Sequence, residues 1–185
     1  MKRIILAAAL AASAAVAEEK AAAPAAPAKM EMPKPPEQMS VEKWFVGSWS
    51  CKGQQHAGPM GPEMKTASKL DMKLELAGFW LQVKGTFAGA GPMKGKEMFE
   101  GFASWDGTQH ARYDFDMNGM TKLTSKGWEG DKLVFNGEMV MGGQKVPAQE
   151  TITKKSDASF TTHLETADKD GKMAVTLEET CTKKN

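Results

Sequence analysis

Apolar and charged residues alternate along much of the chain, and this period of two restricts the fold more than any other feature. In the segment LDMKLEL, residues 70–76, every second residue is apolar and the residues between are charged. Alternation of this kind puts the apolar side chains on one face of a strand and the charged side chains on the other. The same pattern occurs in FWLQVKGTF (79–87), ARYDFDM (111–117), KLVFNGEMVM (132–141) and KMAVTLEET (172–180).

Turn-forming residue pairs separate these segments at short intervals. Asp106-Gly107, Asn118-Gly119, Gly142-Gly143 and Asp170-Gly171 suit tight hairpins, in which glycine supplies a positive φ. Between the strands no helical apolar period occurs, and the segment SVEKWF before them predicts a single helical turn. The sequence therefore predicts an all-β domain of about ten hairpin-linked antiparallel strands, with one longer loop, QQHAGPMGPEMK, after the first strand.

The two cysteines help to decide how such a set of strands buries its apolar face. Two arrangements are open, an up-and-down barrel and a pair of stacked sheets. Cys51 lies on the first predicted strand and Cys181 on the last. In a closed barrel with an even number of strands these two strands are antiparallel neighbours, so a Cys51–Cys181 disulfide is within reach. We predict this bond, which would close a long loop and contribute roughly 4–5 kcal/mol; two free, buried thiols are the alternative.

Several segments resemble a known family. In FVGSWSCKG, Gly47 and Trp49 resemble the Gly-x-Trp motif that opens the first strand of lipocalins and other calycins, where an inward tryptophan closes one end of the barrel. With LELAGFWLQVKGTF (74–87), EGFASWDGTQHARYDFDMNGM (100–120) and ETCTKK (179–184), the chain resembles a bacterial calycin-like family, the domain of unknown function 1579. The resemblance implies a single up-and-down antiparallel β-barrel and no settled activity. The segment AGFW lacks the arginine and one glycine of the family's third strand, so no role of that arginine carries over.

The N-terminal part of the chain has the composition of a targeting segment and a linker. Residues 1–17 combine two basic residues, a short apolar run and a small-x-small cleavage site near Ala17, which predicts a Sec signal peptide and a periplasmic or secreted protein. The apolar run is too short to span a membrane. Residues 18–40 are rich in Ala, Pro and Lys and predict a disordered linker. Residues 41–185 form the predicted barrel domain.

Charge and motifs argue against several classes of function. Without the two basic residues of the predicted signal peptide, the chain has 22 Lys and Arg against 23 Asp and Glu. These charges are interspersed along the chain, so no nucleic-acid partner is expected. The sequence has no Gly-x-Ser-x-Gly elbow and no zinc-ligand spacing. By strand parity, His110 and His163 point outward, while His56 lies in the long loop, which argues against an interior base or an axial haem ligand. We therefore predict no catalytic residue, metal or cofactor.

The predicted inward face combines apolar walls with a few polar groups, as small-ligand sites do. We take it as the candidate lumen, and it comprises Trp49, Leu74, Leu81, Tyr113, Phe115, Phe135, Glu150, Phe160, Thr162, Leu177 and Glu179. An inward glutamate must be paired, protonated or solvated, which favours a wet lumen. The alternative is that Glu150 and Glu179 sit near strand ends and reach bulk water.

The leading functional hypothesis is the binding of a small hydrophobic or amphipathic ligand in this lumen. The main alternative is a structural or envelope-associated domain with a filled core. Two weaker alternatives are an enzyme that uses an inward glutamate with Tyr113, and copper binding by soft thioethers of loop methionines. The methionines concerned are Met60, Met64, Met93, Met117 and Met120. Protein partners are not predicted.

Overall fold

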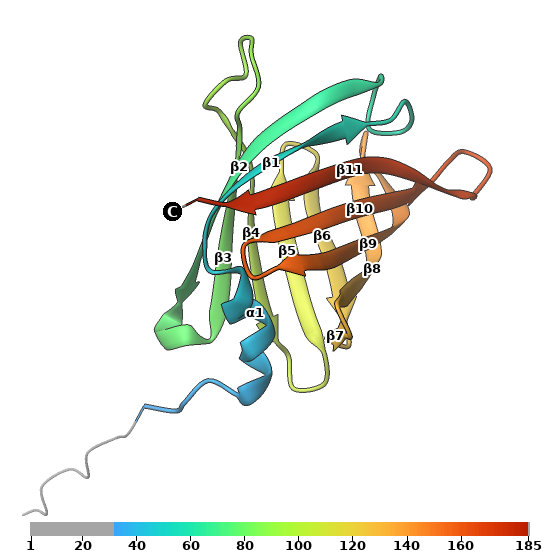
Figure 1. Ribbon diagram of the computed structural model, residues 1–185. Helices are drawn as coiled ribbons and strands as arrows, with labels where there is room; N and C mark the ends of the chain where they lie inside the picture. Colours follow the sequence, from blue (N-terminus) through green and yellow to red (C-terminus); the bar gives the residue numbers. More distant parts are fainter. Residues whose placement is uncertain (1–31, 185) are drawn as a thin grey trace, which may run out of the picture. The chain divides into compact units, whose positions relative to one another are not determined.

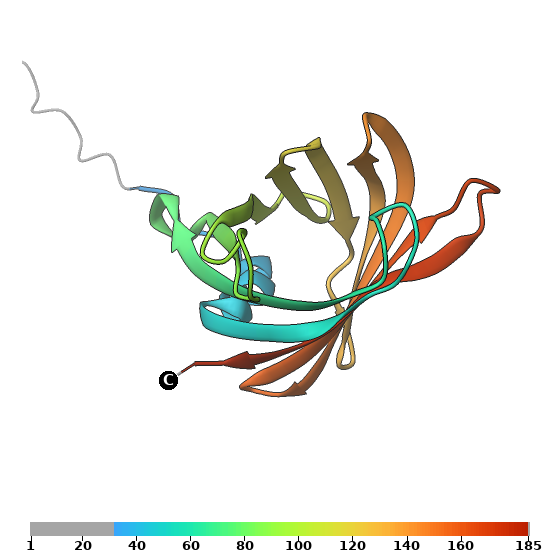
Figure 2. The same ribbon diagram turned by 90° about the horizontal axis from the view of Figure 1, so that it is seen from above.

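Ten antiparallel strands close into a barrel in the computed structural model, which describes residues 32–184 (Figure 1). Each strand pairs with its sequence neighbour, and the ring closes through the pairs β1–β11 and β6–β8 (Figure 2). The predicted all-β up-and-down barrel is thus confirmed. The strands of the ring are β1 Gly47–Gln55, β2 Met64–Glu75, β3 Trp80–Phe87, β4 Glu97–Trp105, β5 His110–Asp116, β6 Gly119–Ser125, β8 Lys132–Met141, β9 Gln144–Ser156, β10 Ser159–Ala167 and β11 Met173–Lys183; the two-residue β7 Trp128–Glu129 flanks β8.

The disulfide lies at the junction that joins the first strand to the last. The register of β1 and β11 places Cys51 directly opposite Cys181, and the two sulfurs are bonded. Both cysteines are fully buried. The predicted pairing is confirmed, and its cause is the topology: an even number of up-and-down strands makes the first and last strands antiparallel neighbours.

A short helical segment precedes β1 and covers one end of the barrel (Figure 1). It consists of the 3-10 turn η1 Glu37–Met39 and the helix α1 Ser40–Phe45, which matches the predicted single turn; a second 3-10 turn, η2 Leu76–Gly78, joins β2 to β3. Met39 is fully buried, so the last residues of the predicted linker pack against the barrel. The predicted signal peptide and most of the linker lie outside the described residues. Within residues 32–184, none of the helices has the length and apolar character that crossing a bilayer requires.

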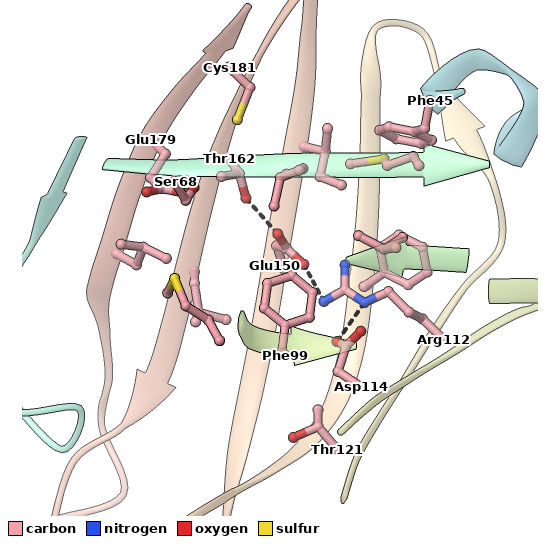
Figure 3. Close-up of a pocket in the computed structure, with 18 of the residues that line it drawn as sticks. Phe45, Ser68, Phe99, Arg112, Asp114, Thr121, Glu150, Thr162, Glu179 and Cys181 are labelled. Carbon is pink, nitrogen blue, oxygen red and sulfur yellow. Dashed lines mark hydrogen bonds and ion pairs between the residues drawn. The ribbon is translucent and has the colours of Figure 1, made fainter. Parts of the chain in front are cut away.

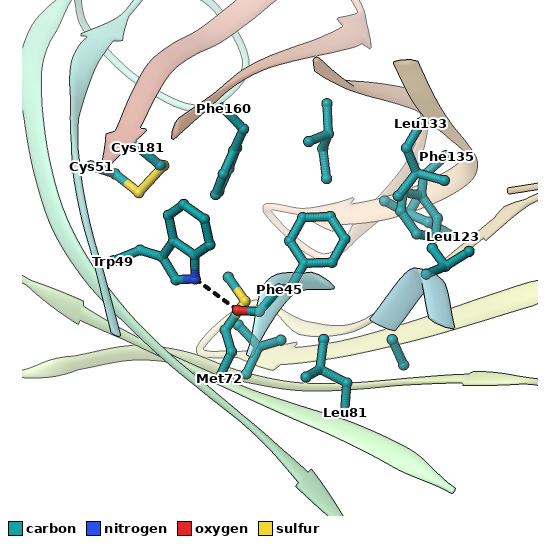
Figure 4. Close-up of a cluster of buried hydrophobic side chains, with 14 of the residues drawn as sticks. Phe45, Trp49, Cys51, Met72, Leu81, Leu123, Leu133, Phe135, Phe160 and Cys181 are labelled. Atoms are coloured by element: carbon teal, nitrogen blue, oxygen red, sulfur yellow. Dashed lines mark hydrogen bonds between the residues drawn. A yellow bond between two sulfur atoms is a disulfide. The ribbon is translucent and has the colours of Figure 1, made fainter. Parts of the chain in front are cut away.

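The buried core includes side chains of this helix-covered end, which we call the plugged end (Figure 4). Trp49 is fully buried there, and its indole N–H donates a hydrogen bond of 2.7 Å to the carbonyl oxygen of Phe45. The ring of Phe160 lies edge-on to Trp49, with centroids 4.9 Å apart. The hydrogen bond satisfies the one polar atom of a buried indole, as such side chains require. Trp49 therefore fills this end of the barrel with its indole side chain.

Candidate functional site

A cavity of about 390 Å³ occupies the barrel between the plugged end and the opposite end, which we call the mouth. Val41 and Phe45 of α1 line its floor. At the mouth it reaches Gln55, where β1 ends, and Met64, where β2 begins. The volume lies within the range of about 300–1,000 Å³ that small-molecule sites occupy.

The wall of the cavity is mainly apolar. One close contact shows how the strands shape it: Gly85 of β3 is the register partner of Phe99 of β4, and a side chain at Gly85 would collide with the Phe99 ring. The glycine therefore lets an aromatic ring lie flat against the strand. The other apolar residues of the wall include Leu70, Met72, Leu81, Val83, Phe87, Phe135, Met139, Ile152, Phe160, Leu164 and Leu177.

A network of charged groups crosses one side of this apolar wall (Figure 3). The Arg112 Nε of β5 donates to Asp114 Oδ2 over 2.9 Å, and Arg112 Nη2 lies 2.5 Å from Glu150 Oε2 on β9. The Thr162 hydroxyl of β10 donates to Glu150 Oε1 over 2.6 Å. Gly101 of β4 is the register partner of Asp114, and a side chain there would collide with the Asp114 carboxylate. Hence a second glycine makes room for a polar group of the lumen.

The lumen raises the pKa of two acids, and for the same reason. Burial raises the pKa of Asp114, and the neighbouring Arg112 opposes that shift. Burial also raises the pKa of Glu179 on β11; the nearby Thr66 hydroxyl opposes the shift and the charge of Glu150 adds to it. Burial acts to lower the pKa of Arg112, but Asp114 and Glu150 outweigh it and raise this pKa, so the guanidinium stays charged.

Most residues of the predicted lumen do line the cavity, and four do not. Those that line it are Leu81, Phe135, Glu150, Phe160, Thr162, Leu177 and Glu179. Trp49 lies in the core of the plugged end, and Leu74 packs against the same core cluster outside the cavity lining. Tyr113 and Phe115 lie on the outer face of β5, so their predicted inward orientation is wrong.

The orientation of β5 is reversed relative to the prediction, with the charged residues inside. Phe115 is 46 % exposed, and the ring of Tyr113 lies 5.4 Å from the Lys122 ammonium. Alternation defines two faces but does not say which one is buried. One clue was present: Glu150 was predicted to point inward and would need a cationic partner, which Arg112 can supply only if the charged face of β5 turns inward.

The reversed parity of β5 also corrects the prediction for His110. This residue is buried, and its Nδ1 lies 2.7 Å from Oε1 of Glu42 on α1. Glu42 borders the cavity, whereas His110 is not part of its lining. His163 is exposed, as predicted, and together with His56 it contacts the Glu178 carboxylate on the outer face, at 3.2 and 2.9 Å.

Among the described residues, one group of three potential metal ligands comes together, namely Cys51, Cys181 and Glu179. Its two sulfurs are bonded to each other in the disulfide, which leaves the carboxylate as the single free donor. Of the methionines considered for copper, Met60 and Met64 line the mouth, while Met93, Met117 and Met120 are exposed. Met98 and Met139 also line the cavity near the mouth.

Comparisons with known proteins support the fold alone. No protein-family model matches the chain, and no curated protein matches it. Among solved structures, Rv2717c from M. tuberculosis superposes with a TM-score of 0.59 at 9 % identity, covering 82 % of this chain and all of that one. A redesigned β-barrel (TM-score 0.40, 14 % identity, 78 % and 96 % covered) and a DUF3598 protein of unknown function from Nostoc punctiforme (0.24, 10 %, 81 % and 100 %) also match, at scores too low to add to the argument. At this identity, function must be argued from the residues of the chain itself.

Proposed function

We propose that this protein binds a small hydrophobic or amphipathic ligand in the lumen of its barrel. The observation that carries the proposal is the cavity of about 390 Å³, with its apolar wall and a few convergent polar groups. Sites for small ligands have this composition. A structural domain with a filled core would bury these side chains against one another, so the open volume favours binding.

The setting of this activity is also part of the proposal. We infer that residues 1–17 direct export and that the barrel acts in the periplasm or outside the cell. The Cys51–Cys181 disulfide supports this, because such bonds persist in oxidising compartments. Membership of the family of unknown function 1579 also remains a proposal, supported by Gly47 and by the fully buried Trp49. The enzyme alternative relied on Tyr113 inside the barrel, and this residue lies outside.

Displacement of a fluorescent apolar probe tests the binding proposal. N-phenyl-1-naphthylamine is a neutral aromatic compound that fluoresces strongly in apolar surroundings, and we expect it to bind with saturation and to be displaced by decanol. Leu177→Trp places a large ring in the lumen and should weaken binding by at least about tenfold, or about 1.4 kcal/mol. The matched control is Glu178→Trp, one residue further along β11 and on the outer face.

Two results would contradict the proposal. One is the absence of saturable fluorescence with the folded wild-type protein. The other is an equal loss of binding in both tryptophan variants, which would place the probe on the surface.

A further inference from the structure

The ionisable groups that line the cavity are strongly unbalanced in charge. Among the described lining residues there are five carboxyl groups and one guanidinium, namely Glu42, Asp114, Asp116, Glu150, Glu179 and Arg112. Glu42 is engaged with His110 at the plugged end. Asp116 is exposed at the mouth, where its Oδ1 accepts the backbone N–H groups of Asn118 and Gly119. Three acids therefore remain in the body of the lumen, with one cation among them.

This cation, Arg112, is already paired with two carboxylates. The guanidinium of Arg112 contacts Asp114 through Nε and Glu150 through Nη2. Its Cζ atom also lies over the Phe135 ring, 5.0 Å from the ring centroid. An anionic ligand would have to displace one of these carboxylates and leave it buried and unpaired. Such a loss costs several kcal/mol in general, so the lumen disfavours a carboxylate or phosphate headgroup.

Glu179 is the acid that this arginine does not pair. It lies on β11, where Thr162 of β10 and Gly53 of β1 are its register partners. Gly53 has no side chain, and Thr66 of β2 is the next residue across it. The Glu179 carboxyl group therefore faces the lumen beside hydroxyl groups and carries no ion pair within the described chain.

A second polar group on this wall lacks a partner. Ser68 of β2 lines the cavity, is 5 % exposed, and its hydroxyl makes no hydrogen bond among the described residues. Its register partner is Cys51, which pairs in turn with Cys181, two residues along β11 from Glu179 on the same face (Figure 3). A buried polar group without a partner is costly and rare in native proteins. A donor supplied by a ligand would satisfy it.

Building on the proposed function, we propose that the ligand is a cationic amphiphile, with an apolar body against the aromatic and aliphatic wall and a protonated amine at Glu179 and Ser68. An ammonium group has three N–H donors and no acceptor, which matches a carboxylate and a hydroxyl oxygen. The excess of acids around Arg112 adds a favourable field. A neutral alcohol satisfies fewer of these groups, and an anion meets repulsion.

Calorimetric titration with three ligands of equal chain length tests this assignment. Decylamine, decanol and decanoate are compared at pH 7, each below its micelle concentration. We expect decylamine to bind at least about tenfold more tightly than decanol, the value of one charge-assisted hydrogen bond, and decanoate to bind more weakly than decanol. If decanol or decanoate equals decylamine, the cationic assignment is overturned while the binding proposal stands. If none of the three binds, the binding proposal itself fails.

Variants of two neighbouring residues locate the headgroup. Glu179→Gln should remove the preference for the amine over decanol, whereas Glu178→Gln makes the same charge change on the outer face and should preserve the preference. Ser68→Ala should lower decylamine affinity by a smaller factor. Equal behaviour of the two glutamine variants would overturn the assignment to Glu179.

The pH dependence provides a readout that a structural role would not produce. An alkylammonium has a pKa of about 10 and stays protonated below pH 7. A loss of decylamine affinity below pH 7 therefore reflects protonation of groups of the protein. Since burial raises the pKa of Glu179 above its ordinary 4.5, the amine preference should decline as the pH falls through that raised pKa. A preference that persists at pH 4 would contradict the proposal.

Discussion

The two ends of the barrel are built from different side chains, although the same ten strands supply both. At the plugged end, rings pack against rings: Trp44 lies 5.5 Å from Trp49, and Phe45 stacks on Trp128 at 5.9 Å. At the mouth the large apolar side chains are mostly methionines, and many are solvent-exposed. These exposed residues are Met64, Met93, Met98, Phe115, Met117, Met120 and Met173.

This difference indicates a division between a part that stabilises and a part that stays adaptable. Aromatic rings bury large areas in fixed geometry, whereas methionine has several rotatable bonds and fits irregular shapes. The plugged end also carries α1 and the fully buried Trp49, while the cavity reaches the mouth. We infer that side chains at the plugged end contribute most to the free energy of unfolding. Substitutions at the mouth should change this free energy little.

The largest effect is expected from truncation at the plugged end. Trp49→Ala removes a fully buried indole and should lower the free energy of unfolding by about 3–5 kcal/mol. Met98→Ala, at the mouth, removes a side chain that is 41 % exposed and should cost less than about 1 kcal/mol. Urea denaturation followed by circular dichroism measures both. Equal costs would contradict the division between the two ends.

Loss of the disulfide should come next. The double variant Cys51→Ser/Cys181→Ser opens a covalent loop with a sequence separation of 130 residues. It should lower the free energy of unfolding by about 2–4 kcal/mol, which is less than the roughly 4–5 kcal/mol of the entropic model because residual structure in the unfolded chain reduces the entropy gained. Reduction of the wild-type protein with dithiothreitol should produce a similar change, and the reductant should leave the double variant unaffected. A fully stable double variant would show that strand pairing alone closes the barrel.

Glu179→Gln should have a smaller effect, in the opposite direction. Because the pKa of Glu179 is raised in the folded protein, its favourable contribution is fully present below the ordinary pKa of 4.5 and is lost as the pH rises through the raised pKa. Above the raised pKa the empty barrel therefore holds an unfavourable buried charge, and the variant should melt a few degrees higher than the wild type there. Melting curves recorded from pH 4 to pH 8 should show this advantage growing with pH. A constant difference would exclude the buried charge as its cause.

The smallest effect concerns the turn between β4 and β5. Asp106 Oδ1 accepts the backbone N–H groups of Thr108 and Gln109, and these hydrogen bonds lower the pKa of Asp106 to about 2. The contribution of the lowered pKa is present above the ordinary value of 3.8 and is lost as the pH falls through 2. Asp106→Ala should therefore be slightly less stable than the wild type at neutral pH. The two melting temperatures should converge in strong acid, and a gap that widens there would contradict this explanation.

The sequence predicted closure better than it predicted the inside of the barrel. Cys51 and Cys181 lie on the first and last strands, and an even number of up-and-down strands makes these two strands antiparallel neighbours. The helical turn at residues 40–45 and the buried Trp49 followed from equally local patterns. The predicted orientation of β5 was wrong, because an alternating pattern does not say which of the two faces of a strand is buried. The inward position of Arg112 and Asp114 depends on Glu150, which is distant in sequence and pairs with Arg112.

The glycines of the lumen show the same limit. Gly85 and Gly101 occur in β3 and β4, where sequence alone suggests weak strand positions. In the folded barrel each makes room for a side chain on the neighbouring strand, Phe99 and Asp114 respectively. Such pairings depend on the register between strands, which the alternating pattern does not determine.

Methyl resonances of the methionines can locate the ligand within the barrel, because methionines occur at both ends of it. The protein is labelled with ¹³C at the methionine methyl groups and titrated with decylamine. If the ligand occupies the lumen, we expect saturable shifts of Met60, Met64, Met98 and Met139, which line the cavity. Met39, which is buried beside α1 at the plugged end, should not shift. Shifts confined to outward methionines such as Met117, which is 86 % exposed, or the absence of any saturable shift, would contradict this expectation.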